Sequence, residues 1–208
     1  MRALYFLATI PFYFVAKLFQ ILNFDEINSD FKKCEVHLDS IYQFVDDETL
    51  NILFLAEDHR FSMHFGIDHY AMLRAIYCTK FKNEFQGAST VAQQYVRVIT
   101  ERYERTWIRK FREQLLSILI CRKYSHKHIA TAYLKIAFLG SGLNGIDKYL
   151  RREHKKYSQL STIEKIEIVA RLKYPEPLKH KGLWLFKMKI RVTNISCKLA
   201  KKSLPASL

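Results

Sequence analysis

The sequence predicts a mostly α-helical domain preceded by a membrane-spanning helix. Only 6 of the 208 residues are Gly and 4 are Pro, which disfavours folds built from many short strands and turns. Several segments rich in helix-forming residues place apolar side chains at three- and four-residue steps. Hydrophobic residues make up 49% of the chain. This is enough material for a buried core and excludes a disordered basic tail.

The first expected helix is the apolar N-terminal segment. The twenty residues from Ala3 to Leu22 contain a single charge, on Lys17, and this is about the length that crosses a hydrocarbon core of ~30 Å. We therefore predict an uncleaved anchor over residues 1–24. A cleaved signal peptide is disfavoured because no small-residue cleavage pattern follows, and an interfacial or buried helix is the remaining alternative. Arg2 before the apolar span and an acidic segment after it favour a cytoplasmic N-terminus.

The remaining chain divides by charge. Residues 25–58 carry ten acidic and two basic side chains, whereas residues 59–208 carry thirty basic and ten acidic ones. A basic domain predicts a polyanionic partner, which could be nucleic acid, phospholipid head groups or a phosphorylated substrate. We expect a polar stalk over 25–48, a globular domain over 49–178 and a basic amphipathic tail over 179–208. The tail suits either an anionic membrane surface or a last core helix with a solvated basic face.

Start and stop signals divide the domain into helices. Thr90, Ser125 and Ser161 are expected N-caps, and Ser161 forms a capping box with Glu164. Gly140 is expected to end the helix that Ser125 begins. The expected helices cover 48–57, 91–99, 106–124, 126–139 and 161–173.

The first segment whose residue types could carry a catalytic or binding function contains acids, histidines and a glycine within residues 57–68. A zinc site built from His59, His64, Asp68 and His69 is disfavoured, because their spacing is not that of a zinc-binding helix and no distant ligand set is evident.

Two further segments suit an anion. Residues 87–94 offer backbone N–H groups at a helix start, and six basic residues then crowd into 97–112, just before Glu113. On a continuous helix Arg105, Arg109 and Arg112 would share one face and could bind phosphate oxygens. The alternative is an ordinary solvated basic face.

Together these segments resemble glycosyltransferase family 51, the lipid II polymerase domain of peptidoglycan synthesis, in its small, monofunctional, membrane-anchored form. The family's first motif, E-D-x-x-F-x-x-H-x-G-x-D, is met by Glu57, Asp58, Phe61, His64, Gly66 and Asp68. The second, G-x-S-T-x-x-Q-Q, is met by Gly87, Ser89, Thr90, Gln93 and Gln94. The third, R-K-x-x-E, is met by Arg109, Lys110 and Glu113.

The resemblance implies a lysozyme-like, largely helical fold with a membrane-dipping region that includes residues 70–85. It casts Glu57 as the catalytic base and Glu113 as the second essential glutamate. Glu113 would hold the surrounding cations in place or bind a divalent metal, Mg²⁺ or Mn²⁺, although the sequence by itself requires no cofactor. The implied substrate-binding residues are Asp58, His64, Ser89, Thr90, Gln93, Gln94, Arg97, Arg105, Arg109, Lys110 and Arg112.

The resemblance also implies partners and a location. Lipid II, the growing glycan chain, the membrane and cell-wall synthesis proteins are the expected partners. No nucleic acid is expected, because the sequence has no helix-turn-helix, RRM or zinc signature. The expected location is the bacterial cytoplasmic (inner) membrane, with one span and the catalytic domain on the extracytoplasmic side.

Some positions depart from the family pattern. Arg97 and Val98 stand where Lys and Asn are usual, and the fourth motif reads Tyr133-Leu134-Lys135 and Phe138-Leu139-Gly140 in place of Y-L-N and Y-F-G. These departures keep a second hypothesis open, a non-catalytic membrane scaffold that binds a lipid-linked precursor or a divisome partner.

Overall fold

The computed structural model describes residues 1–43 and 45–203. Position 44 of the expected stalk and positions 204–208 of the expected tail lie outside the described residues. The chain forms two compact units, and each contains two stretches of sequence. Unit 1 comprises Met1–Tyr42 and Arg60–Ala132, and unit 2 comprises Gln43–His59 and Tyr133–Leu208. Helices dominate both units, which confirms the predicted fold class.

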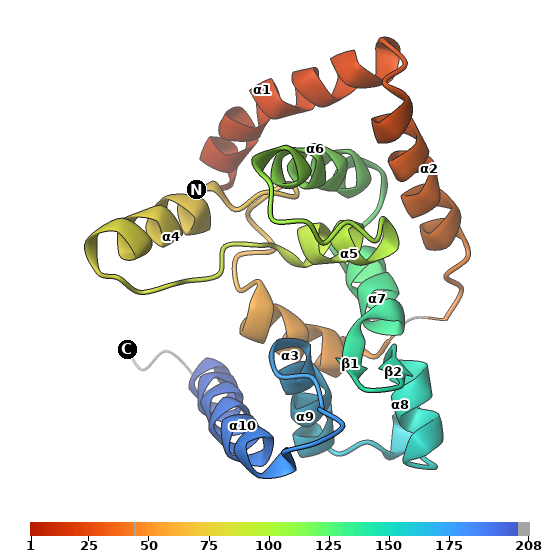
Figure 1. The fold of residues 1–208 in the computed structure, drawn as a ribbon, viewed down its shortest axis with the longest axis vertical. Coiled ribbons are helices and arrows are strands. Elements are labelled where there is room, and N and C mark those ends of the chain that lie inside the picture. Colours follow the sequence, from red (N-terminus) through yellow and green to blue (C-terminus); the bar gives the residue numbers. More distant parts are fainter. Residues whose placement is uncertain (44, 204–208) are drawn as a thin grey trace. The chain divides into compact units, whose positions relative to one another are not determined.

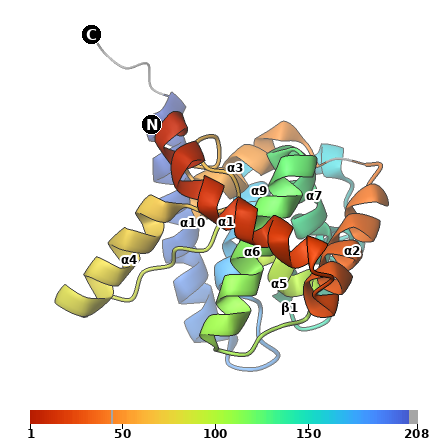
Figure 2. The same ribbon diagram turned by 90° about the horizontal axis from the view of Figure 1, so that it is seen from above.

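Unit 1 is built around one buried helix. Its helices are α1 (Arg2–Ile21), α2 (Asp25–Asp39), α4 (His69–Phe81), α5 (Val91–Ile99), α6 (Trp107–Lys123) and the first part of α7 (His126–Ile136). Helices α1, α2 and α5 all contact α6 (Figures 1 and 2). The middle of α6 is buried on every side, from Glu113 to Ile120. This central helix therefore fixes the frame on which the second and third motifs lie.

Helix α1 is the apolar helix expected at the N-terminus. By length and composition it can cross a membrane, with a mean hydropathy of 1.5 over its best window. Two polar contacts attach it to unit 1: the Tyr5 hydroxyl donates to Asp68 Oδ1 at 2.8 Å, and Thr9 Oγ1 lies 3.1 Å from His69 Nε2. The opposite side exposes apolar residues such as Phe14. One side of the helix is thus joined to the protein and the other is suited to lipid.

Helix α2 lies within the segment expected to be a stalk, and it packs against α6. Its acidic side chains pair with bases of unit 1. Arg102 Nε lies 2.8 Å from Asp30 Oδ2, and Lys123 Nζ lies 2.7 Å from Glu35 Oε1. Part of the acidic segment therefore neutralises basic residues far away in the sequence.

Unit 2 contains α3 (Asp47–Glu57), β1 (Phe138–Gly140), β2 (Leu143–Asn144), α8 (Ile146–Arg152), a 3-10 turn (Tyr157–Gln159), α9 (Thr162–Lys173) and α10 (Lys181–Ser203). Helices α3, α9 and α10 pack together (Figure 1). Their core includes Leu53 of α3 and Ile168 of α9, neither of which is exposed. The capping box of α9 is present as predicted, with Ser161 and Glu164 bonded to each other's backbone N–H groups.

The predicted helix over 126–139 is wrong at its C-terminal end. Helix α7 stops at Ile136, and Phe138 pairs with Asn144 in a short antiparallel hairpin. The reason is a close backbone approach at Gly145, whose N–H donates to Ala137 O at 2.8 Å. Gly145 has φ +85°, and a Cβ there would lie 1.8 Å from Lys135 O. A residue without a side chain lets the chain fold back before the helix can reach Gly140.

Helix α10 forms most of the predicted tail and has two different faces. Met188 and Ile195 are buried, whereas Leu183, Phe186 and Ile190 are exposed. The helix therefore packs as a core helix along one face. Its exposed apolar residues and the many lysines around them leave the membrane-surface alternative as a prediction.

The two faces of α10 predict unequal costs for the same substitution. Ile195→Ala should lower the free energy of unfolding by about 3 kcal/mol, because it leaves a cavity at a fully buried site. Ile190→Ala should change it by less than about 0.5 kcal/mol, because that side chain is exposed. Denaturant unfolding in detergent measures both values. Equal costs for the two variants would contradict the packing of α10.

Candidate functional site

The second and third motifs meet in unit 1 because both lie at helix starts. Thr90 caps α5, and its hydroxyl accepts a hydrogen bond from Gln93 N at 3.2 Å. Thr106 caps α6 in the same way, accepting from Arg109 N at 3.1 Å. Since α5 and α6 pack together, polar residues along α5, including Arg97 in its last turn, converge with those at the start of α6.

They converge on the carboxylate of Glu113, which is 2% exposed. Arg97 binds both of its oxygens, through Nε at 2.9 Å and Nη2 at 3.1 Å. Lys110 Nζ lies 2.5 Å from Oε1, and Arg109 Nη1 donates to Oε2. We call these four residues the Glu113 cluster. With three cations and one anion, it retains two positive charges.

Lys110 connects this cluster to the second motif. Its ammonium group donates to Ser89 Oγ at 3.0 Å and to Gln93 Oε1 at 2.9 Å, in addition to Glu113. The Gln93 side-chain nitrogen is buried and has no hydrogen-bond partner among the described residues. The site therefore offers an unused donor beside a surplus of positive charge, which suits an anionic ligand.

The electrostatics of the Glu113 cluster reflect its burial. Burial works to raise the pKa of Glu113, but hydrogen bonds from Arg97 and Lys110 and their positive charges outweigh it, so the pKa lies below its usual value. Burial is also the largest effect on Lys110, and it lowers the pKa of that ammonium group despite the opposing charge of Glu113. Glu113 is therefore held as a carboxylate that fixes three cations.

Three other predicted ligands are not among the four residues of the Glu113 cluster, although Arg112 lines a small hollow together with Arg97, Arg109 and Glu113. Arg105 precedes the first residue of α6 and is exposed, so it does not continue a helical face with Arg109 and Arg112. Arg112 forms a salt bridge with Glu26 of α2. Gln94 is half-buried on α5.

Most of the first motif also lies in unit 1, where its contacts hold the backbone. His64 is buried, and its Nδ1 accepts a hydrogen bond from Gly66 N at 3.3 Å. The hydroxyl of Thr90 donates to Gly66 O at 2.8 Å, which joins the first motif to the second. Asp68 caps α4 and accepts from Arg60 Nε at 2.8 Å.

The two acids that open the first motif belong to unit 2. Glu57 is the last residue of α3, and Asp58, 5% exposed, is its C-cap. The Glu57 side chain is 16% exposed, and Oε1 accepts a hydrogen bond from Arg191 Nη2 at 2.7 Å. Sequence reasoning missed Arg191, which was one base among many in the predicted tail. Its only signal is its helical spacing from the apolar residues Met188 and Ile195.

A resident divalent cation does not fit the carboxylate of Glu113. Both of its oxygens are engaged by cationic side chains, and no group of three or more His, Cys, Asp or Glu within residues 1–43 and 45–203 could hold a metal ion.

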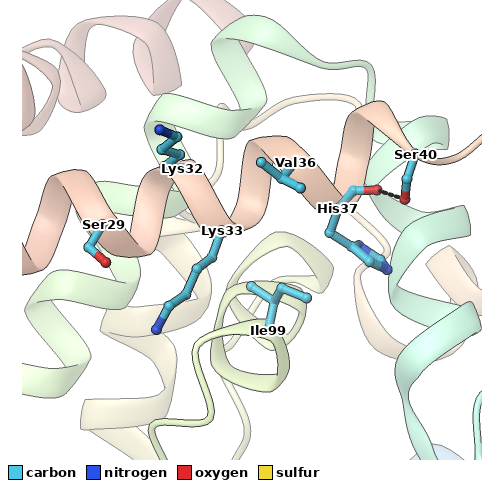
Figure 3. Close-up of a pocket in the computed structure, with 7 residues that line it drawn as sticks. All are labelled: Ser29, Lys32, Lys33, Val36, His37, Ser40 and Ile99. Atoms are coloured by element: carbon cyan, nitrogen blue, oxygen red, sulfur yellow. Dashed lines mark hydrogen bonds between the residues drawn. The ribbon is translucent and has the colours of Figure 1, made fainter.

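A hollow of about 580 Å³ lies elsewhere in unit 1, along α2 (Figure 3). Six of its lining residues come from the segment 29–40, and Ile99 comes from α5. His37, whose pKa is lowered by burial, lines one end. The hollow contains no residue of the three motifs.

Comparison with known proteins shows the family of the chain. The family model described as Transglycosylase matches residues 25–193. A biosynthetic peptidoglycan transglycosylase of Shigella sonnei (strain Ss046) is 36% identical over 128 residues, which is 61% of this chain and 52% of that protein. The protein of the same name from Salmonella arizonae is 36% identical over 129 residues, again 61% of this chain and 52% of the relative. The chain spans about half the length of these curated relatives.

The two motif glycines predict opposite outcomes for substitution by alanine. Gly66 has φ +98°, and a Cβ there would lie 2.6 Å from Ser117 O of α6. Gly66→Ala should therefore cost about 3 kcal/mol of stability. Among the described residues, no atom lies within 4 Å of the same position at Gly87, so Gly87→Ala should be nearly neutral. Thermal unfolding compares them, and a stable Gly66→Ala variant would contradict the close packing against α6.

Stability should depend on pH through Glu113. Because its pKa is lowered on folding, its contribution is present above the unfolded value of about 4.3 and is lost as pH falls through the folded value. Glu113→Gln should cost roughly 2 kcal/mol at pH 7, a modest figure because the three cations are partly exposed. The gap between wild type and variant should narrow below about pH 4.3.

Thermal unfolding at a series of pH values tests this, with Glu101→Gln as the control because Glu101 is exposed. A gap that does not change with pH would mean that the charge of Glu113 is not what stabilises unit 1.

Proposed function

Because the chain belongs to the transglycosylase family, we propose that it is a peptidoglycan glycosyltransferase that polymerises lipid II into glycan strands, with undecaprenyl diphosphate as the leaving group. The observation that carries the proposal is the Glu113 cluster. It holds partly exposed, oriented positive charge on the two motifs from which the family resemblance implies a pyrophosphate site. The family match and the names of the relatives support this activity for the protein.

The reaction needs a base and a group that stabilises the departing pyrophosphate. The Glu57 carboxylate takes the proton of the acceptor's 4-hydroxyl while that oxygen bonds to the anomeric carbon of the donor. The bond from the anomeric carbon to the phosphate oxygen breaks, and the electron pair leaves with the pyrophosphate. This single displacement inverts the anomeric centre.

The Glu113 cluster stabilises the charge that develops on the leaving group. Arg97, Arg109 and Lys110 are already fixed by Glu113, so little reorganisation is needed when the pyrophosphate oxygens gain charge. Ser89 and Gln93 add hydrogen-bonding groups at the same place. Glu113 acts as a positioning residue in this scheme because it is covered by the cations it holds.

The location follows from the same proposal. In the proposed arrangement α1 anchors the chain in the bacterial cytoplasmic membrane as a single span, and the catalytic domain lies on the extracytoplasmic side. Spanning the membrane in this direction requires α1 to release the contacts of Tyr5 with Asp68 and of Thr9 with His69, because both lie near its proposed cytoplasmic end. The exposed apolar residues Leu73, Tyr77, Phe81 and Phe85 on and after α4 support the proposed membrane-dipping region. Cell-wall synthesis proteins are proposed partners.

The altered fourth motif favours the scaffold hypothesis only weakly. Lys135, which replaces the usual Asn, lies 3.1 Å from Asp147 Oδ2 in unit 2. The unusual lysine therefore has its own acidic partner, and the departure does not leave an unpaired charge in the fold.

Polymerisation of fluorescent lipid II in detergent tests the proposed function. Wild type should make polymer, Glu57→Gln should lower the rate by at least about 100-fold because the base is lost, and Glu113→Gln should lower it because the cations lose their anchor. Glu101→Gln should be unchanged. Parallel reactions with a chelator or with added Mg²⁺ or Mn²⁺ measure metal dependence.

Two results would count against the proposal. A wild-type protein that binds lipid II but makes no polymer would support the scaffold hypothesis. Full activity in Glu57→Gln would remove Glu57 from the mechanism.

A further inference from the structure

The C-terminal helix α10 reaches the proposed base of unit 2. Arg191 lies 134 residues after Glu57 in the sequence, yet its Nη2 donates to Glu57 Oε1 at 2.7 Å. The Arg191 side chain is 13% exposed and that of Glu57 is 16% exposed. This ion pair is therefore largely shielded from solvent. The geometry of a shielded pair is better defined than that of a surface pair.

Arg191 also binds the end of the helix that carries Glu57. The same Nη2 donates to Ala56 O at 3.0 Å. Carbonyls in the last turn of a helix have no partner within the helix, and a cation there interacts favourably with the helix dipole. One guanidinium group thus fixes both the backbone and the carboxylate at the C-terminus of α3.

Packing holds the guanidinium group in place. Met188 and Ile195 lie one turn before and after Arg191 and are buried, and α10 contacts both α3 and α9. Lys165 of α9 binds Asp46 and Glu48 at the opposite end of α3. Helix α10 therefore supplies a cation that binds the Glu57 carboxylate.

The guanidinium group has unused capacity. Its Nε is buried and has no hydrogen-bond partner among the described residues. A buried donor without a partner is uncommon and carries a cost. If Arg191 served only to hold two helices together, we would expect its Nε–H to donate a hydrogen bond to another protein group.

We propose that Arg191 is a positioning residue for catalysis, which fixes the orientation of the Glu57 carboxylate. The inference rests on the proposed function, because it needs Glu57 to be the base. It makes the C-terminal helix a part of the catalytic unit. If the carboxylate were displaced, substrate would still bind. A smaller fraction of the bound complexes would then have the carboxylate in the geometry that proton transfer from the acceptor hydroxyl needs.

Steady-state polymerisation of lipid II by the full chain tests this, with kcat and KM measured separately. Arg191→Gln should lower kcat by about 10- to 100-fold and change KM by less than about 2-fold. Arg191→Lys keeps one charged donor and should recover part of kcat. Lys187→Gln, an exposed base on the same helix, should behave as wild type. Thermal unfolding of each variant reports whether it folds.

The outcomes separate the inference from the function on which it rests. An inactive wild type would refute the proposed function itself. An active wild type with unchanged kcat in Arg191→Gln would overturn the inference alone. A rise in KM that accounts for the whole loss of activity would make Arg191 a substrate ligand. An equal loss of thermal stability in the Gln and Lys variants that accounts for their loss of activity would make Arg191 purely structural. Either result overturns the positioning role.

Discussion

The burial of Glu113 among three cations is the interaction on which the site in unit 1 depends. A carboxylate that is 2% exposed must be paired or lose its charge, and cations held this close must be neutralised in part or repel one another. The cations pair the buried carboxylate, and the carboxylate neutralises part of their charge. The arrangement also needs α5 and α6 to pack closely, since Arg97 comes from one helix and Lys110 from the other.

The chain uses its uneven charge within the fold as well as toward partners. Acidic residues of α2 pair with Arg102, Arg112 and Lys123 of unit 1. The acidic segment is therefore more than a spacer between anchor and domain, because it removes part of the repulsion among the bases. The positive charge that remains unpaired includes the surplus of the Glu113 cluster, where an anionic leaving group would be bound.

In unit 2 an ion pair joins two helices. Glu57 and Arg191 bring the end of α3 and the middle of α10 together, so a segment that reads as a basic tail becomes part of the core. The exposed face of the same helix carries Leu183, Phe186 and Ile190. One helix thus combines a buried polar contact with an exposed apolar surface.

The sequence by itself determined the helical class, the apolar N-terminal helix, the caps at Thr90 and Ser161 and the three motifs, because these depend on local patterns of a few residues. Only the tertiary structure decided where α7 ends, since that depends on the approach of Gly145 to Lys135 O. It also decided that Arg97 binds Glu113 while Arg105 and Arg112 do not, and that Arg191 meets Glu57. These pairings join residues far apart in the sequence, and charge alone cannot specify which of 34 bases reaches which acid until packing has fixed the helices.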